Sequence, residues 1–167
     1  LALGNIDSYI EIPDIDYENC WNIGGVSVFN EIYDVRGDFP KESIVGASLV
    51  EMRRLDSILG IEPAGLVKVD VEGCEKEAIE GMQSFLEASG YPAIIFEAWG
   101  FSWFKEKKDT LFEFLNDIGY VFISDVFDHG NHLAQHKKSL HPVIVIEDLN
   151  NGFIKTHTLP VGAIENA

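Results

Sequence analysis

Acidic side chains stand at the points where three predicted strands end. The first strand ends in Asp70-Val71-Glu72-Gly73, the second in Glu97, and the third in Asp125, with Asp128 and His129 just after it. Ligands of open α/β sheets bind beyond the carboxyl ends of the strands. Carboxylates gathered there could take a proton from a hydroxyl or hold a divalent cation. The residue types and their positions therefore indicate that catalysis or ligand binding takes place at this edge of the sheet.

The first of these strands carries charge at every second position. Strand alternation predicts Lys68, Asp70 and Glu72 on one face and three valines on the other. Unpaired burial would cost several kcal/mol for each charge, so these side chains should be paired or should line a cleft. The structural alternative is a Lys68–Asp70 ion pair, with Glu72 and Glu75 serving the N-terminus of the next helix.

The spacing of apolar residues predicts an α/β fold in one domain, residues 1–167. Residues 1–60 are predicted to be an irregular, β-rich lead-in, and residues 61–167 a βαβαβ unit followed by a hairpin. Such alternation builds a mostly parallel sheet with helices on both faces, and the hairpin would add antiparallel edge strands. The predicted strands are 9–12, 26–29, 66–71, 93–96, 120–126, 142–147 and 153–158, with an extended segment at 43–53, helices at 74–90 and 109–118, a helical turn at 56–59, a polar loop at 128–139 and a turn at Asn151-Gly152.

The net charge of the chain limits the classes of partner that it is expected to bind. Twelve basic residues against 28 acidic ones give a net charge of −16. Such a surface repels phosphate backbones and anionic lipid, so we expect neither nucleic acid nor membrane as a partner. No apolar run approaches the roughly 18 residues that a membrane span needs. Two cysteines do not make a disulfide framework in a chain of this length, so a cytoplasmic location is the default expectation.

Four motifs occur in the order and spacing of a known family. The segment Lys68–Glu75 (KVDVEGCE), followed by Ile79-Glu80-Gly81, resembles the K-x-D-x-E-G-x-E…L-x-G signature of the FkbM family of S-adenosylmethionine-dependent methyltransferases. Leu55–Ile58 resembles the L-D-x-L segment of that family, and Ile95–Glu97 its apolar strand ending in Glu. Asn22–Ser27 resembles its N-x-G-G-x-S loop. The resemblance covers nearly the whole chain, although only the stretch around Asp70 is specific.

The resemblance implies a fold, an activity and a cofactor. The fold is a Rossmann-like class I methyltransferase sheet of seven strands, the last of them antiparallel. On that map the strands at 66–71, 93–97, 120–126 and 142–147 are the fourth to seventh, and residues 1–3 are the tail of the third. The activity is methylation of hydroxyls on sugars, glycans or polyketides, with S-adenosylmethionine as the cofactor.

One part of the family pattern has no counterpart in this sequence. The first two strands and the D-x-G-x-N-x-G loop that grips the cofactor are missing, so the domain is expected to be N-terminally truncated. Asn22–Gly25 is a poor substitute because no apolar strand precedes it, and no residue is assigned to the cofactor. Without these strands, the sheet edge beside the Asp70 strand would expose unpaired backbone groups that could pair with a strand of another chain. We expect a longer gene product, a homo-oligomer, or early segments folded over that edge.

Aromatic and histidine side chains add further candidates. Trp99 and Trp103 follow the second acidic strand end, where they could stack on a sugar ring or form a small satellite core with Phe101 and Phe104. Three histidines lie in the predicted 128–139 loop. One of them could act as general base, and their helical spacing is the only argument for a metal site, which we do not predict. The three are His129, His132 and His136.

The sequence as a whole predicts an O-methyltransferase acting on a hydroxyl of a sugar, glycan or other small molecule. Asp70, Glu72 and His129 are the predicted catalytic residues, with Asp70 or His129 taking the proton. Glu97, Trp99 and Trp103 are predicted to bind the acceptor. The alternative is a truncated, non-catalytic relative that binds a partner chain or glycan. A receiver-type phosphotransfer module is disfavoured, because its paired acids would lie near the first strand of the chain.

Overall fold

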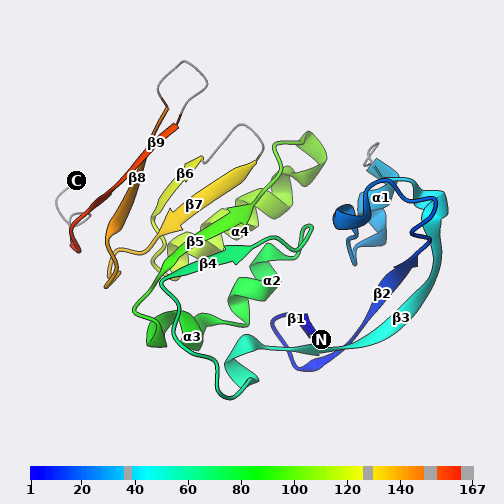
Figure 1. The fold of residues 1–167 in the computed structure, drawn as a ribbon, viewed down its shortest axis with the longest axis horizontal. Helices are drawn as coiled ribbons and strands as arrows, with labels where there is room; N and C mark the ends of the chain where they lie inside the picture. Colours follow the sequence, from blue (N-terminus) through cyan, green and yellow to red (C-terminus); the bar gives the residue numbers. More distant parts are fainter. Residues whose placement is uncertain (36–38, 126–129, 149–153, 163–167) are drawn as a thin grey trace. The chain divides into compact units, whose positions relative to one another are not determined.

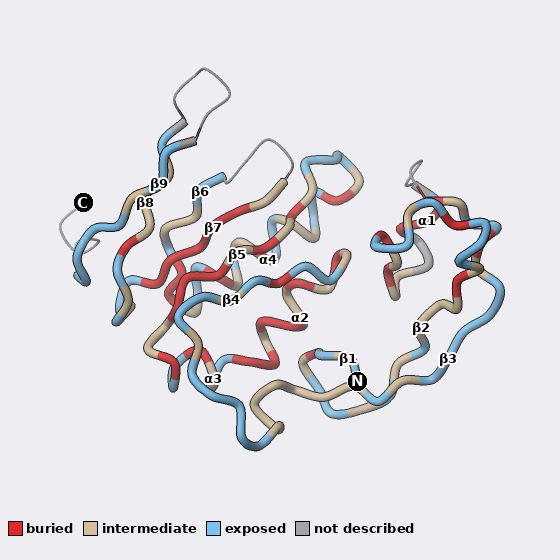
Figure 2. The backbone as a smooth tube through the Cα atoms, in the orientation of Figure 1, coloured by how far each residue is buried: buried red, intermediate tan, exposed pale blue. Residues whose placement is uncertain are grey.

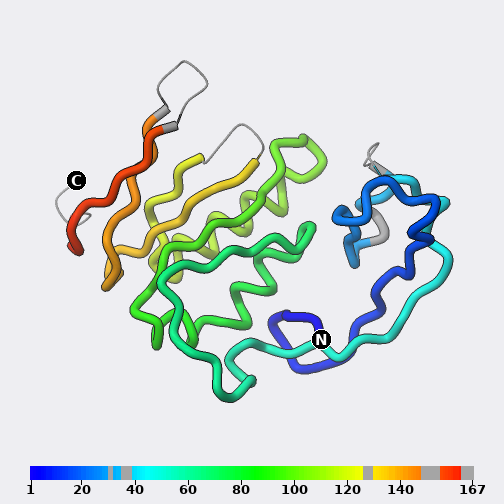
Figure 3. Tube along the Cα trace, viewed as in Figure 1, coloured from blue at the N-terminus to red at the C-terminus, as the bar shows by residue number. Residues whose placement is uncertain are grey.

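The computed structural model describes residues 1–35, 39–125, 130–148 and 154–162. The chain forms two compact units, shown in Figure 1. Unit 1 consists of Leu1–Gly60 and Asp70–Gln83, and unit 2 consists of Ile61–Val69 and Ser84–Ala167. The path of the chain, which enters unit 2, returns to unit 1 and enters unit 2 again, can be followed by colour in Figure 3.

Unit 1 is built on a long two-stranded ribbon. Strand β2 (Ser8–Ile15) pairs antiparallel with β3 (Ile44–Arg53), and β1 (Ala2–Leu3) pairs parallel with β3 at Met52 and Arg53. The register shifts between Asp14 and Ile15. Most of the ribbon is exposed or half-buried (Figure 2). The strand predicted at 9–12 and the extended segment at 43–53 are both confirmed, and the first is longer than its apolar pattern indicated.

The core of unit 1 lies at one end of the ribbon. Ile15, Cys20, Tyr33 and Phe39 form a buried cluster, with the Tyr33 and Phe39 rings 4.7 Å apart. The strand predicted at 26–29 is wrong, because the Ser27 side chain binds the backbone N–H of Phe29 and the chain turns into a helix. The short helices here are η1 (Ile23–Gly25), α1 (Asn30–Val35), η2 (Lys41–Ser43) and η3 (Leu55–Ser57), the last of which confirms the helical turn near residue 56.

The helix predicted at 74–90 is two shorter helices. Helix α2 (Glu75–Glu80) ends at Gly81, and α3 (Gln83–Ala88) follows after Met82. The apolar periodicity runs through the break, which is why the sequence predicted one helix. The predicted helix at 109–118 is α4 (Lys105–Asp117), which begins one turn earlier, directly after the 3-10 helix η4 (Ser102–Phe104). Within the described residues, no helix is long and apolar enough to span a membrane.

Unit 2 contains a four-stranded mixed sheet. The strands β4 (Leu66–Val69), β5 (Ala93–Glu97), β7 (Asn131–Gln135) and β6 (Phe122–Asp125) lie in that order. Strand β4 pairs parallel with β5, while β7 is antiparallel to both β5 and β6. Three of the four strands therefore point the same way. The predicted α/β class and the strands near 66, 93 and 120 are confirmed. The prediction of a mostly parallel sheet is wrong for its pairings, because β4–β5 is parallel while β5–β7 and β6–β7 are antiparallel.

Strand β7 falls where the sequence predicted a polar loop. Its sequence, Asn-His-Leu-Ala-Gln, lacks β-branched residues, yet it lies between β5 and β6 and is almost wholly buried. Its polar side chains reach partners on other elements: His132 contacts the backbone oxygen of Ala98, and Gln135 bonds Ile144. These partners are distant in sequence, so local composition could not show that the segment is buried.

Helix α4 packs on one face of this sheet and a strand on the other. The Phe96 and Phe112 rings meet edge to face at 5.8 Å between β5 and α4. On the opposite face, Ala93 and Leu133 pack against Ile144 and Ile146. Those isoleucines belong to β8 (Val143–Asp148), which pairs antiparallel with β9 (Ile154–Leu159). The predicted hairpin strands are confirmed, but they form a sheet of their own instead of extending the first. Asn151-Gly152 lies outside the described residues.

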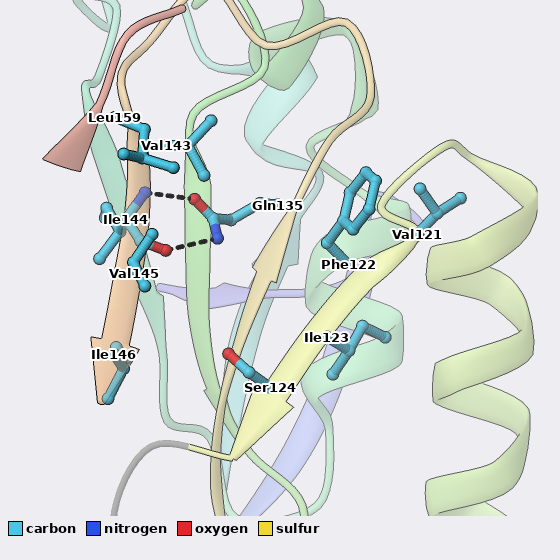
Figure 4. A pocket seen from close by; sticks show the side chains of 10 residues that line it. All are labelled: Val121, Phe122, Ile123, Ser124, Gln135, Val143, Ile144, Val145, Ile146 and Leu159. Carbon is cyan, nitrogen blue, oxygen red and sulfur yellow. Dashed lines mark hydrogen bonds between the residues drawn. The ribbon is translucent and has the colours of Figure 1, made fainter. Parts of the chain in front are cut away.

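The side chain of Gln135 attaches β8 to β7. Its amide nitrogen donates to the Ile144 carbonyl at 2.8 Å, and its amide oxygen accepts from the Ile144 N–H at 2.7 Å (Figure 4). The amide thus replaces a backbone pairing between the two sheets. Beside it lies a cavity of about 470 Å³, lined mainly by apolar side chains of β6 and β8.

Replacing Gln135 by leucine is expected to loosen this attachment. Leucine makes neither bond, and the Ile144 N–H and carbonyl lose their shared partner, at a cost of about 2 kcal/mol. Hydrogen exchange at the Ile144 amide should become faster. Gln83→Leu is the matched control, because the Gln83 amide donates from an exposed position to the Glu80 carbonyl. Equal exchange at Ile144 in both variants would contradict the role of Gln135.

Candidate functional site

The residues after β4 form a tight loop in place of a longer strand. The strand ends at Val69, and Asp70 is the first residue beyond it. Glu72 and Gly73 both adopt left-handed backbone conformations, with φ of 52° and 97°. The predicted alternation of Lys68, Asp70 and Glu72 on one strand face is therefore wrong at Glu72. Lys68 is exposed.

Glu75 folds this loop back onto the start of α2. Its side chain is buried, with 2% of the residue exposed. One carboxylate oxygen, Oε1, accepts hydrogen bonds from the backbone N–H of Val71 at 3.2 Å and of Gly73 at 3.3 Å. Glu75 is the first residue of α2, where the helix dipole also favours a negative charge. The structural alternative from the sequence is thus confirmed for Glu75.

Ser27 holds the same loop from a distant part of unit 1. Its hydroxyl donates to the Glu72 carbonyl oxygen at 2.8 Å and accepts from the Phe29 N–H at 3.2 Å. Tyr33 fixes Ser27 in turn, since its hydroxyl accepts from the Ser27 N–H at 2.6 Å and donates to the Ser27 carbonyl. Left-handed backbone costs a residue with a side chain about 1–2 kcal/mol. The bonds from Ser27 and Glu75 offset that cost at Glu72.

Replacing Ser27 by alanine is expected to destabilise unit 1 by about 2 kcal/mol. The change leaves the half-buried Glu72 carbonyl and Phe29 N–H without the hydroxyl that binds both. Urea unfolding followed by circular dichroism measures the loss. Ser48→Ala is the control, since the Ser48 hydroxyl donates to Asp14 from an exposed position. A loss no larger than that of Ser48→Ala would contradict the clamping role of Ser27.

In unit 2, two strands that lie on either side of β7 end in acidic residues at the same edge of the sheet. Glu97 is the last residue of β5 and Asp125 the last of β6. Both strands run antiparallel to β7, so both carboxyl ends point to the same edge. Glu97 lies opposite Asn131 and Asp125 opposite His132. Asp128 and His129, the latter a predicted catalytic residue, lie outside the described residues.

The aromatic residues after β5 pack on one another. The Trp99 and Trp103 rings are 5.6 Å apart, and each also contacts the Phe104 ring. Phe104 is buried, whereas Phe101 is 59% exposed and stacks on Trp103 at 5.5 Å and 8°. The cluster is therefore a satellite core around Phe104. It also presents a flat aromatic surface to solvent at Phe101.

His132 and His136 are both buried but differ in their partners. In His136, Nδ1 accepts from the Lys138 N–H at 2.9 Å, Nε2 lies 3.0 Å from the Ile118 oxygen, and the ring stacks on Tyr91. Its ring nitrogens are satisfied, and it has a structural role. Because the segment is a strand and a turn, the helical spacing that suggested a metal site carries no weight. The sequence named His132 only within that loop.

The ring of His132 lies between charged side chains. Nε2 lies 3.2 Å from the Ala98 oxygen and 3.1 Å from Nζ of Lys108. Nδ1 lies 2.7 Å from Oδ1 of Asp125. Burial lowers the pKa of His132, and the nearby Lys108 ammonium lowers it further. The ring is therefore neutral at neutral pH.

Comparison with known proteins gives one match. The model of the methyltransferase FkbM domain matches residues 5–122, which include Asp70, Glu72, Glu97, Trp99 and Trp103. No curated protein and no solved structure matches the chain.

Proposed function

Because the chain belongs to the FkbM methyltransferase domain family, we propose that it is an O-methyltransferase whose methyl donor is S-adenosylmethionine. The acceptor is a hydroxyl of a sugar, a glycan or another small molecule. The family match over residues 5–122 carries this proposal. The acidic strand ends support it, since transfer to a hydroxyl releases a proton that a nearby group must accept.

The sheet of unit 2 is compatible with half of a Rossmann-like methyltransferase sheet. Three strands share a direction, and β7, late in the chain, opposes them. We assign β7 as the antiparallel last strand of that sheet. The segment 142–147, which the sequence placed there, belongs to the separate hairpin.

The proposed roles are those that the sequence predicts for the acidic and aromatic residues. Asp70 and Glu72 act on the acceptor hydroxyl from the loop after β4, and Glu97 positions the acceptor from the end of β5. The strained backbone of Glu72 supports a functional role, because such conformations concentrate at active sites. Trp99 and Trp103 support the exposed Phe101 ring, on which the apolar face of a sugar can stack.

The described residues do not supply the glycine-rich loop that would hold S-adenosylmethionine. Such a loop joins a strand to a helix, so that backbone N–H groups meet the ligand. Here β2 ends at Ile15, a turn closed by the Cys20 N–H on the Asp16 carbonyl follows, and Asn22–Gly25 forms a single 3-10 turn. The residues present do not fit the cofactor, and we assign none of them to it.

This misfit favours the second candidate function, a non-catalytic relative that binds a glycan or a partner chain. Calorimetric titration of the chain with S-adenosylmethionine and S-adenosylhomocysteine separates the two. Micromolar binding of either ligand would support the methyltransferase. No binding at millimolar ligand, with the chain folded by circular dichroism, would support the binding module.

A further inference from the structure

Strand β3 has a long edge that no strand among the described residues covers. Its other edge pairs with β2 over nearly the whole strand, whereas β1 covers the open edge only at Met52 and Arg53. Residues 45–49 are all exposed (Figure 2), and the Leu49 residue is 67% exposed. A sheet edge with bare backbone groups is a template on which another strand can pair.

The two edges of the ribbon differ in the residues that discourage such pairing. On β2, Pro13 has no N–H to donate, and Glu11 carries a charge. On β3, residues 44–50 contain neither a proline nor a charged side chain. The nearest charge on that strand, Glu51, is already paired with Arg53 at 2.8 Å. The β2 edge is therefore protected against a further strand, and the β3 edge is not.

The hydrogen bond between Gly4 and β3 shows which backbone groups point away from β2. The Gly4 N–H donates to the Arg53 carbonyl at 3.0 Å, on the side of β3 where β1 lies. Backbone groups alternate between the two sides of a strand, so the N–H and C=O of Ala47 and Leu49 point to that same open side. The alternation holds over this stretch because the shift of register between β2 and β3 lies beyond Gly46.

We propose that β3 pairs antiparallel with β3 of a second copy of this chain, about a two-fold axis at Ser48. The outward backbone groups of Ala47 then bond those of Leu49 in the second copy, and the reverse. In side-chain terms, each leucine lies opposite an alanine, and on the other face Val50 lies opposite Gly46. Large residues thus meet small ones, and the strand is complementary to itself. The pairing does not depend on the proposed function.

Charge and size determine how strong this dimer should be. The net charge of −16 on each copy opposes association at long range. Residues 46–50 carry no charge, so salt that screens the long-range repulsion should strengthen the dimer. A single pair of strands is a small interface beside the roughly 1,200–2,000 Å² of stable complexes. The dimer should therefore form at high protein concentration and dissociate on dilution.

Sedimentation velocity of the whole chain at rising concentration tests the association, and amide hydrogen exchange locates it. The wild type should shift from monomer to dimer, more readily at higher salt. The Ala47 and Leu49 amides should exchange more slowly where the dimer forms, while the Ser48 amide, which points to β2, should change little. A monomer at every concentration, or a dimer in which the Ala47 and Leu49 amides stay unprotected, would overturn the proposal.

Paired charge substitutions test the two-fold register. Ala47→Lys with Leu49→Lys sets ammonium groups opposite each other and should raise the dimer dissociation constant about tenfold. Because this change reduces the net negative charge, general repulsion would predict the opposite result. Ala47→Glu with Leu49→Lys sets a carboxylate opposite each ammonium and should retain the dimer. Tyr9→Lys, at a 66% exposed position on β2, is the control and should match the wild type. Equal association of the two double variants would refute the pairing about Ser48.

Discussion

Replacing Glu75 by alanine is expected to destabilise unit 1 by about 3 kcal/mol and to unfold the loop that carries Asp70 and Glu72. The Glu75 carboxylate is the acceptor for the backbone N–H groups of Val71 and Gly73. Alanine leaves both donors without it, and a buried donor without a partner costs about 1–3 kcal/mol. The left-handed conformation of Glu72 also loses one of its supports. Denaturation followed by circular dichroism measures the stability.

Two variants separate this role from a general effect of removing charge. Glu75→Gln keeps an oxygen that can accept both bonds, so it should retain most of the stability. Glu77→Ala removes a half-buried carboxylate from the same helical turn and should cost little. Amide exchange at Val71 and Gly73 should rise in Glu75→Ala alone. Similar exchange in all three variants would show that Glu75 does not hold the loop.

Replacing Gly81 by alanine is expected to cost about 3 kcal/mol, again in unit 1. A Cβ on Gly81 would overlap the Gly4 carbonyl oxygen and crowd the Gly4 carbonyl carbon. Both neighbours are backbone and cannot rotate away, so the segment after β1 must move. Adding atoms to a packed site costs about 1–3 kcal/mol, and more where the backbone must shift. The Gly81 carbonyl also accepts from the Asp56 N–H, and this bond would be strained by the movement.

Gly24→Ala is the matched control for Gly81→Ala. A Cβ there would meet no atom within 4 Å, and Gly24 does not have a left-handed backbone. Alanine should therefore leave the stability unchanged within about 1 kcal/mol, because it restricts the unfolded chain without a clash. Urea midpoints of the two variants test the pair. If Gly81→Ala were as stable as Gly24→Ala, the close packing of α2 against the segment after β1 would be refuted.

The residues of the motifs around Asp70 fall into two groups, those that hold the backbone in place and those that are left for chemistry. Ser27, Glu75 and Gly81 hold backbone in place: the first two bind the loop after β4, and the glycine permits a close crossing of two segments. Asp70 and Glu72 are the members left for chemistry in the proposed function. A motif of charged residues thus contains a carboxylate whose job is structural, and residue type alone does not separate it from its neighbours.

The pattern of apolar residues along the sequence was sufficient to predict the elements whose buried side chains are apolar. The strand at β5 and the helix α4 follow from runs that only a protein interior explains. Patterning failed at β7, where the buried side chains include His132 and Gln135, because their hydrogen-bond partners come from remote segments. It also failed at α2 and α3, because a periodic apolar face continues across the break at Gly81.

The sequence by itself determined the α/β class, the acidic strand ends and, through four spaced motifs, the family. All of these depend on local composition and on order along the chain. The tertiary structure alone decided that Glu72 turns away from the strand, that Ser27 and Glu75 hold it there, and that His132 lies behind Asp125. Each of these depends on a hydrogen bond or a strand register joining distant segments, or on a turn that such bonds impose, and spacing along the chain does not encode them.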